Sequence, residues 1–268
     1  MSSASGPLSA ESIRAALAHI PLVRRVVYLP SVGSTNDAAR VLGERGAPHA
    51  TLVVADDQTT GRGRLGRSWT MPPLSGLALS ILVRPDLAAS RVNRLTMLAG
   101  LAAAEGIEQA TGLAVDLKWP NDVVIQNAQR KVRKLGGILC ESALVGEQID
   151  YAVVGIGLNL NFDFADQPEL SETATSVMLH AGHEVDRLRV LAAVIERFAA
   201  RFADLHSDRL RVVWAERLLT LGRRVEARAG AATWIGLAEA VDGDGALLLR
   251  TDDGTLRRLQ AADVTLQA

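Results

Sequence analysis

The apolar positions of the chain follow two different periods, which predict alternating strands and helices over roughly the first 220 residues. Short runs rich in β-branched residues predict strands, because such side chains pack well on a pleated sheet. These runs cover residues 25–29, 51–55, 77–83, 114–119, 122–126, 134–142 and 149–158. Apolar positions that recur every three or four residues predict helices at about residues 9–19, 34–45, 90–111 and 188–219. The last four strands follow one another closely, which predicts an α+β fold with a mixed, largely antiparallel sheet and flanking helices.

The pattern changes after Leu221. Short apolar runs are then separated by two turn signals rich in Asp and Gly, at residues 242–245 and 252–254. This spacing favours a small all-β barrel or half-barrel. We therefore predict a larger domain over residues 1–221 and an all-β module over residues 222–268.

Composition narrows the classes of function. The 268 residues carry a net charge of −1, so any attraction for an anion must come from local basic clusters. A single cysteine, Cys140, excludes an intramolecular disulfide, and no Cys/His cluster has the spacing of zinc ligands, so we expect no metal held by the protein itself. The apolar stretches are too short to span a bilayer, and residues 1–10 lack a signal-peptide pattern. We expect a cytoplasmic protein with no membrane association.

The first candidate for chemistry is the segment 61–69, Gly-Arg-Gly-Arg-Leu-Gly-Arg-Ser-Trp. Its glycines let backbone N–H groups approach an anion closely, and its arginines offer forked donors suited to carboxylate or phosphate. This composition indicates a loop that closes over a negatively charged ligand. A basic surface loop, or a nucleic-acid contact of the Arg-Gly type, would look similar.

The second candidate is the segment 118–122, Lys-Trp-Pro-Asn-Asp, at the end of a predicted strand. Pro120 fixes its own φ and favours an extended residue before it, so Lys118 and the pair Asn121-Asp122 are held near one another. An ordinary hairpin corner has the same turn chemistry, and this segment alone does not decide between them.

Two further strands carry paired glycines, at 136–137 and at 155 and 157. Glycine inside a strand loses packing, which is usually offset by something that approaches the backbone. Each pair is also explained by a bulge or by tight sheet packing. Together the two strands predict the floor of one flat, narrow pocket.

The five segments 33–36, 61–67, 118–122, 134–139 and 155–159 resemble the motifs of the biotin protein ligases, in that family's order and approximate spacing. The resemblance covers about residues 25–268 and implies an SH3-like β-barrel module at the C-terminal end. It implies the enzyme-only subgroup, without the N-terminal helix-turn-helix domain that some members carry, so we expect no DNA binding. A homodimer is compatible with the resemblance.

The resemblance also implies an activity. Such ligases join biotin to ATP, which enters as its Mg²⁺ complex, to give biotinyl-5′-AMP, and then transfer the biotinyl group to a lysine of a biotin carboxyl carrier protein. Negative charge concentrates on the phosphate in both steps, so fixed positive donors should supply most of the catalysis. By motif, Lys134 should contact the reacting carboxylate and the α-phosphate, Arg62 and Arg64 should hold the intermediate, and Arg64 should close the loop. Asp122 should orient the acceptor amine or a metal-bound phosphate, and Lys118 should assist with charge.

The remaining site residues are implied in the same way. Ser34, Thr35 and Gln58 should hydrogen-bond the ureido ring of biotin, helped by the backbone of three glycines. Trp69 should pack beside the adenine or the biotin tail, and Asn159 should line the nucleotide side. The full set of expected binding residues outside the charged groups is Ser34, Thr35, Asn36, Gln58, Gly61, Gly63, Trp69, Asn121, Gly137, Gly155, Gly157 and Asn159.

Two other functions compete with this interpretation. A lipoate or octanoate ligase shares the fold and the adenylate chemistry, but it would need an apolar slot in place of donors for a ureido ring. A nucleic-acid-binding regulator would use the basic loops to bind phosphate. The near-neutral net charge argues against this function. Cys140 lies in an apolar strand and is expected to pack in the core. The histidines are expected to be solvated.

Overall fold

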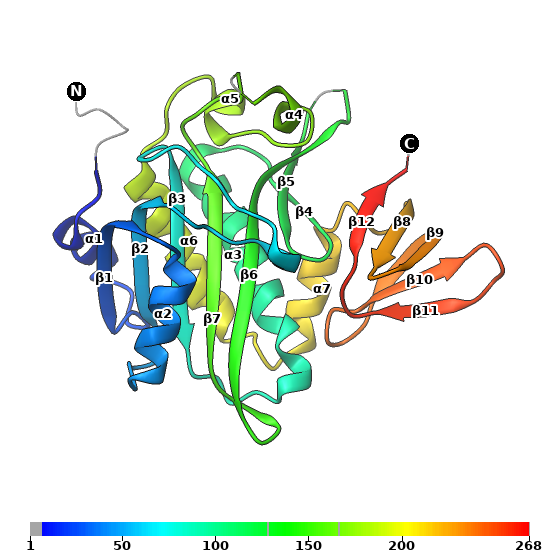
Figure 1. Cartoon of the computed structure of the whole chain (residues 1–268), viewed down its shortest axis with the longest axis horizontal. Coiled ribbons are helices and arrows are strands. Elements are labelled where there is room, and N and C mark those ends of the chain that lie inside the picture. Colours follow the sequence, from blue (N-terminus) through cyan, green and yellow to red (C-terminus); the bar gives the residue numbers. More distant parts are fainter. Residues whose placement is uncertain (1–6, 128, 166, 268) are drawn as a thin grey trace.

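The computed structural model describes residues 7–127, 129–165 and 167–267 (Figure 1). In this part of the chain one seven-stranded sheet forms the centre of the larger domain, in the order β1-β2-β3-β7-β6-β5-β4. Its strands are β1 (Arg25–Val32), β2 (Thr51–Gln58), β3 (Gly76–Val83), β4 (Asp116–Lys118), β5 (Asp122–Gln126), β6 (Val132–Val145) and β7 (Gln148–Asn159). Only β1 and β2 pair in parallel, and the other described neighbours are antiparallel. The predicted mixed, largely antiparallel sheet is confirmed.

Helices cover both faces of this sheet (Figure 1). On one face α2 (Thr35–Glu44) packs on β2, β3 and β7, where Val53 and Leu82 belong to a small core. The main core lies on the other face, which α3 (Asn93–Thr111) and α6 (Arg187–Phe202) cover. In β2, Leu52 and Val54 belong to this main core while Val53 belongs to the small one, so the continuous apolar run is explained by burial of both faces.

The ends of the helices differ from the prediction in several places. α1 (Ala10–Leu17) is capped by Ser9 and is shorter than expected, and α3 begins later than expected, after the short 3₁₀ turn η2 (Ala89–Arg91). The helical stretch expected over 188–219 is divided into α6 and α7 (Asp208–Glu216), and Ser207 caps the second helix. The short helices α4 (Pro168–Ser171) and α5 (Val177–Ala181) were not predicted, because so few residues show no period.

The C-terminal module is a five-stranded antiparallel sheet of order β11-β10-β9-β8-β12. Its strands are β8 (Arg224–Ala229), β9 (Ala232–Val241), β10 (Leu247–Thr251), β11 (Leu256–Leu259) and β12 (Asp263–Leu266). No pairing joins β11 to β12 among the residues described, so the sheet is a half-barrel and not a closed barrel. A boundary near Leu221 stays a prediction.

Two hydrogen bonds from the larger domain fasten this module. The buried Arg94 of α3 donates through Nη1 to the carbonyl of Gly243 at 2.7 Å, and through Nε to the carbonyl of Leu205 at 2.6 Å. The indole of Trp119 donates to the carbonyl of Gly245 at 2.8 Å. Because buried polar groups are costly when unpaired, these bonds hold the module's 243–245 turn against α3 and the end of β4.

A second buried arginine stabilises the opposite end of the domain. Arg187 of α6 forms an ion pair with Asp56 of β2 at 2.6 Å, and their side chains are 1% and 4% exposed. The same carboxylate accepts a hydrogen bond from Tyr28 at 2.6 Å, and burial together with Asp56 raises the pKa of Tyr28 to about 12. In the ranges described, no helix is long and apolar enough to cross a membrane.

Candidate active site

A cleft of about 570 Å³ opens beside the strands that carry the glycine pairs. Several parts of the chain line it: the Gly/Arg segment, the end of β2 and the start of α2, residues 118–122, the strands β6 and β7, and β8 and β12 of the C-terminal module. Most residues singled out from the sequence line this one cleft, namely Ser34, Thr35, Asn36, Gln58, Arg62, Gly63, Arg64, Trp69, Lys118, Asn121, Asp122, Lys134, Gly137, Gly155 and Gly157. The glycine-bearing strands do lie side by side, with Gly137 opposite Gly157 and Leu139 opposite Gly155.

Lys134 is directed into the cleft by an irregularity in the sheet. The pairing of β5 with β6 shifts between Val123 and Val124, so that Val124 pairs with Lys134 and the register skips Leu135. The extra residue re-aims the strand. Leu135 is buried in the main core, while Lys134 reaches Asp122 with Nζ 2.5 Å from the carboxylate.

Gly137 makes room for this amine. A Cβ at position 137 would lie 3.3 Å from both Cε and Nζ of Lys134, closer than side chains normally tolerate. The Lys134–Asp122 pair is only partly solvated, with side chains 33% and 20% exposed. The amine is therefore held at a defined place on the cleft wall.

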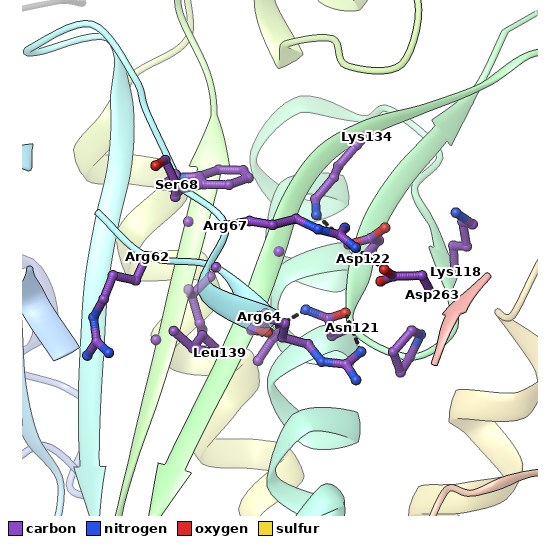
Figure 2. A pocket seen from close by; sticks show the side chains of 18 of the residues that line it. Arg62, Arg64, Arg67, Ser68, Lys118, Asn121, Asp122, Lys134, Leu139 and Asp263 are labelled. Carbon is purple, nitrogen blue, oxygen red and sulfur yellow. Dashed lines mark hydrogen bonds and ion pairs between the residues drawn. The ribbon is translucent and has the colours of Figure 1, made fainter. Parts of the chain in front are cut away.

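Two more cationic groups approach the same place (Figure 2). Lys118 of β4 lies opposite Asp122 of β5 in the strand pairing. Burial lowers the pKa of Lys118, an effect that the charge of Asp122 opposes and the charge of Lys134 reinforces. Arg64 donates to Asn121 Oδ1 at 3.2 Å, and burial likewise lowers the pKa of Arg64. The peptide bond that joins Trp119 to Pro120 is cis. The arrangement concentrates positive charge around one partly buried carboxylate.

Uncharged polar groups from the end of β2 and the start of α2 line another part of the cleft. Gln58 Oε1 accepts from the backbone N–H of Thr35 at 2.8 Å and from its hydroxyl at 3.0 Å. The buried hydroxyl of Ser80, a residue that sequence reasoning did not identify, lies 2.8 Å from Thr35 Oγ1. Within the described residues no hydrogen bond uses the amide nitrogen of Gln58 or the hydroxyl of Ser34, so both can serve a ligand.

The side chain of Ser34 does not cap the helix that follows it. Ser34 stands at the N-cap of α2, but its side chain makes no capping bond. Gln58 accepts the bond from the first helical N–H instead. This exchange is a tertiary effect, because Gln58 belongs to the end of β2.

Arg62 does not point toward Lys134 (Figure 2). Its guanidinium pairs with Asp37 at 2.7 Å and with Glu141 at 3.2 Å, at the side of the cleft where α2 begins. Asn36 donates to the same Glu141 carboxylate at 2.7 Å, so its amide is already engaged. These partners are far apart in sequence, and the expected contact of Arg62 with the intermediate stays a prediction.

Two of the glycines accommodate side chains of the chain itself. A Cβ at position 155 would lie 2.2 Å from Asn36 Oδ1, and a Cβ at position 157 would lie 2.6 Å from the indole nitrogen of Trp69. That nitrogen is buried and has no partner among the residues described. The indole of Trp69 therefore packs on the glycine-bearing floor of the cleft, with its nitrogen covered.

Two expected residues do not line the cleft. Gly61 accepts a bond from the N–H of Trp69, and a Cβ at 61 would lie 2.3 Å from the carbonyl of Trp69, so Gly61 shapes the base of the loop. Asn159 donates its amide to the carbonyl of Thr175 at 3.0 Å. It lines a neighbouring cavity of about 720 Å³, which shares Ser68, Trp69, Lys118, Asp122 and Lys134 with the cleft.

Several lining residues were missed by sequence reasoning. Arg67 and Ser68 lie within the Gly/Arg segment and could have been included from composition alone. Apolar residues of the central sheet, such as Leu79 and Ile156, were also missed. A further group comes from the C-terminal module, where no local signal links them to the site: Glu226, Arg228, Asp263, Val264 and Thr265. The module thus forms one wall of the cleft.

Cys140 fits the expected core role, because it packs against the main core and burial raises the pKa of its thiol to about 12. The solvated state expected of the histidines is wrong for two of them. His49 accepts from the N–H of Arg84 at 3.0 Å and contacts Phe202, and His180 lies in α5 with Nε2 3.0 Å from the hydroxyl of Thr175. Burial lowers the pKa of both imidazoles.

Comparison with known proteins defines the class to which this fold and cleft belong. Residues 28–159 match the biotin/lipoate A/B protein ligase family, and residues 220–266 match the biotin protein ligase C-terminal domain. The bifunctional ligase/repressor BirA of Bacillus subtilis is 35% identical over 97% of this chain and 80% of its own length. The biotin–[acetyl-CoA-carboxylase] ligase of Paracoccus denitrificans is 35% identical over 84% of this chain and 94% of its own.

A solved structure agrees with the sequence relatives. The biotin protein ligase of Aquifex aeolicus, in complex with biotin and ATP, superposes with a TM-score of 0.75 at 29% identity, over 91% of this chain and 99% of that one. The protein belongs to the biotin protein ligase family.

Proposed function

We propose that this enzyme is an ATP-dependent biotin protein ligase that forms biotinyl-5′-AMP and transfers the biotinyl group to a lysine of a biotin carboxyl carrier protein. The observation that carries the proposal is the position of Lys134. Its amine lies where a cleft with an uncharged polar part meets a second cavity, and each compartment can take one of two substrates.

Biotin is assigned to the cleft. The ureido ring presents N–H donors and a carbonyl acceptor, which suit the Gln58 amide, the Ser34 hydroxyl and the Thr35–Ser80 hydroxyl pair. Lipoate has an apolar dithiolane ring, which would leave the Gln58 amide nitrogen and the Ser34 hydroxyl without a partner, at a cost of about 1–3 kcal/mol each. The polar part of the cleft therefore favours biotin over lipoate.

ATP is assigned to the side of Lys134 where the second cavity lies. The cations Lys118 and Lys134 line both compartments and suit a triphosphate, since charge-assisted bonds to phosphate are the strong ones. No group of three or more acidic, His or Cys side chains suited to a metal occurs among the described residues. A Mg²⁺ ion that enters with ATP would then be held chiefly by phosphate oxygens, and it would neutralise phosphate charge.

The chemistry follows from these positions. A carboxylate oxygen of biotin attacks the α-phosphorus, the bond from that phosphorus to the bridging oxygen breaks, and pyrophosphate leaves with the electron pair. Lys134 stabilises the charge that develops on the α-phosphate oxygens. An acceptor lysine amine then attacks the acyl carbon and expels AMP, and Asp122 orients this amine through its carboxylate. Holding the partners in place replaces any need for an acyl-enzyme.

The test is biotin-dependent exchange of labelled pyrophosphate into ATP, followed by transfer of biotin to a purified biotin carboxyl carrier protein. Lipoate and octanoate serve as matched substrates. Exchange that biotin promotes and that lipoate and octanoate do not promote supports the proposal. Exchange that lipoate promotes equally well, or adenylate formation without transfer to the carrier, would contradict it.

A further inference from the structure

The Gly/Arg loop, residues 61–69, is bound to the C-terminal module at one point. Arg67 forms an ion pair with Asp263, the first residue of β12, although 196 positions separate them in the chain. Their side chains are 62% and 42% exposed. In Figure 2 the Arg67 side chain extends across the cleft toward Asp122 and Asp263.

Asp263 lies close to the other charges of the site. Its negative charge opposes the lowering of the pKa of both Arg64 and Lys118 by burial. Its own strand pairs only with β8 among the described strands, so Asp263 occupies an edge that the module presents to the cleft. The module therefore places one carboxylate opposite the basic loop.

The rest of the loop has few attachments. At its tip Leu65 is 72% exposed and has a φ of 55°, a left-handed conformation uncommon for leucine. Backbone bonds hold the loop to itself, with Gly63 N–H donating to the Arg67 carbonyl and Arg67 N–H to the Arg64 carbonyl. Beyond these, Arg62 pairs with Asp37 and Glu141 at one end of the loop, and Arg64 contacts Asn121 and Arg67 contacts Asp263 at the other. If the part of the loop around Arg67 is to move away from the cleft, the Arg67–Asp263 pair must break.

We propose that Asp263 is a positioning residue through which the C-terminal module, by way of Arg67, keeps the Gly/Arg loop closed over the adenylate. The proposal rests on the ligase function above and assigns the module a part in retaining the intermediate. An exposed ion pair is weak, which suits a loop that must open again for the acceptor lysine.

The first test is the rate at which the enzyme releases labelled biotinyl-AMP after dilution. Asp263→Asn should release it about two- to fivefold faster than wild type, the effect expected from loss of one exposed ion pair. Pyrophosphate exchange should stay near the wild-type rate, because Lys134 is intact. The matched control is Asp252→Asn, which removes a similarly exposed pair with Arg224 in the same module, away from the cleft.

Charge reversal supplies the second test. Asp263→Arg should accelerate release at least as much as Asp263→Asn, and adding Arg67→Asp should bring the double variant back to within about twofold of wild type, because the pair is restored in the opposite sense. A structural defect in β12 would not be rescued by a change in the loop. Higher salt should raise release from wild type more than from Asp263→Asn.

Three results would overturn the proposal: equal release from Asp263→Asn and Asp252→Asn, no rescue in the double variant, or equal salt dependence. If one of these results is found while the wild-type enzyme makes adenylate, the ligase assignment stands and only the role of Asp263 is refuted. A wild type that makes no adenylate refutes both.

Discussion

Replacing Lys134 by alanine gives the most direct test of the proposed chemistry. The amine lies on the cleft wall, 2.5 Å from the Asp122 carboxylate. The register shift in β6 brings only this ammonium of the described residues to that position. Losing a charged contact to the transition state typically costs about 3–4 kcal/mol, or 10² to 10³ in rate. Lys134→Ala should therefore slow biotin-dependent pyrophosphate exchange by at least about 10²-fold.

Part of that loss has a second origin. Without the amine, the partly buried Asp122 carboxylate would face the incoming phosphate unpaired, which adds repulsion. Removing Asp122 as well should relieve this part, so the double variant Lys134→Ala/Asp122→Ala should lose less activity in exchange than the sum of the two single losses. Because the ion pair is partly exposed, the free energy of unfolding should change by no more than about 1 kcal/mol.

The control is Lys131→Ala, which removes the same type of side chain three residues earlier. Lys131 is exposed and lines the second cavity, but it does not line the cleft, and none of the ion pairs between described residues includes it. Exchange should stay within about threefold of wild type. Similar losses in Lys131→Ala and Lys134→Ala, or a normal rate in Lys134→Ala with a folded protein, would refute the assigned role.

Three further predictions follow from the structure. Arg64→Gly loses its bond to Asn121 and loosens the loop, so the variant should still make biotinyl-AMP but should label serum albumin more than wild type does; inactivity in exchange would contradict this lid role. Asp56→Asn leaves the buried Arg187 without its carboxylate and should lower the free energy of unfolding in urea by about 3–5 kcal/mol, whereas a loss under 1 kcal/mol would count against it. The lowered pKa of Lys118 means that its charge is lost below the ordinary value of 10.5, so exchange should decline on the alkaline side earlier than an ordinary lysine would cause. Stability should rise with pH over that same window, because the unfolded chain binds more protons there. In Lys118→Arg the alkaline decline should shift upward, and identical profiles would contradict the assignment.

The local pattern of the sequence determined the secondary structure and the members of the site to a large extent. Apolar runs at 51–55 and 77–83 identified central strands, because a strand that is buried on both faces needs apolar side chains at successive positions. The paired glycines at 136–137, 155 and 157 identified two neighbouring strands. Motif residues from five separate segments were expected at one site, and most of them line one cleft.

Only tertiary structure decided how the side chains are used. The register shift between β5 and β6 sets Lys134 opposite Val124 and brings its amine to Asp122, which no local pattern shows. Gln58 replaces Ser34 as the acceptor for the first N–H of α2, since the end of β2 lies beside that helix.

Long-range charges were equally hidden. Arg62 pairs with Asp37 and Glu141, and Arg67 with Asp263, because packing brings together carboxylates from distant segments. Periodicity and capping act over a few residues, so they can be identified along the chain. Ion pairs across a cleft depend on where whole elements come to lie, and that is set by burial of the two cores and docking of the C-terminal module.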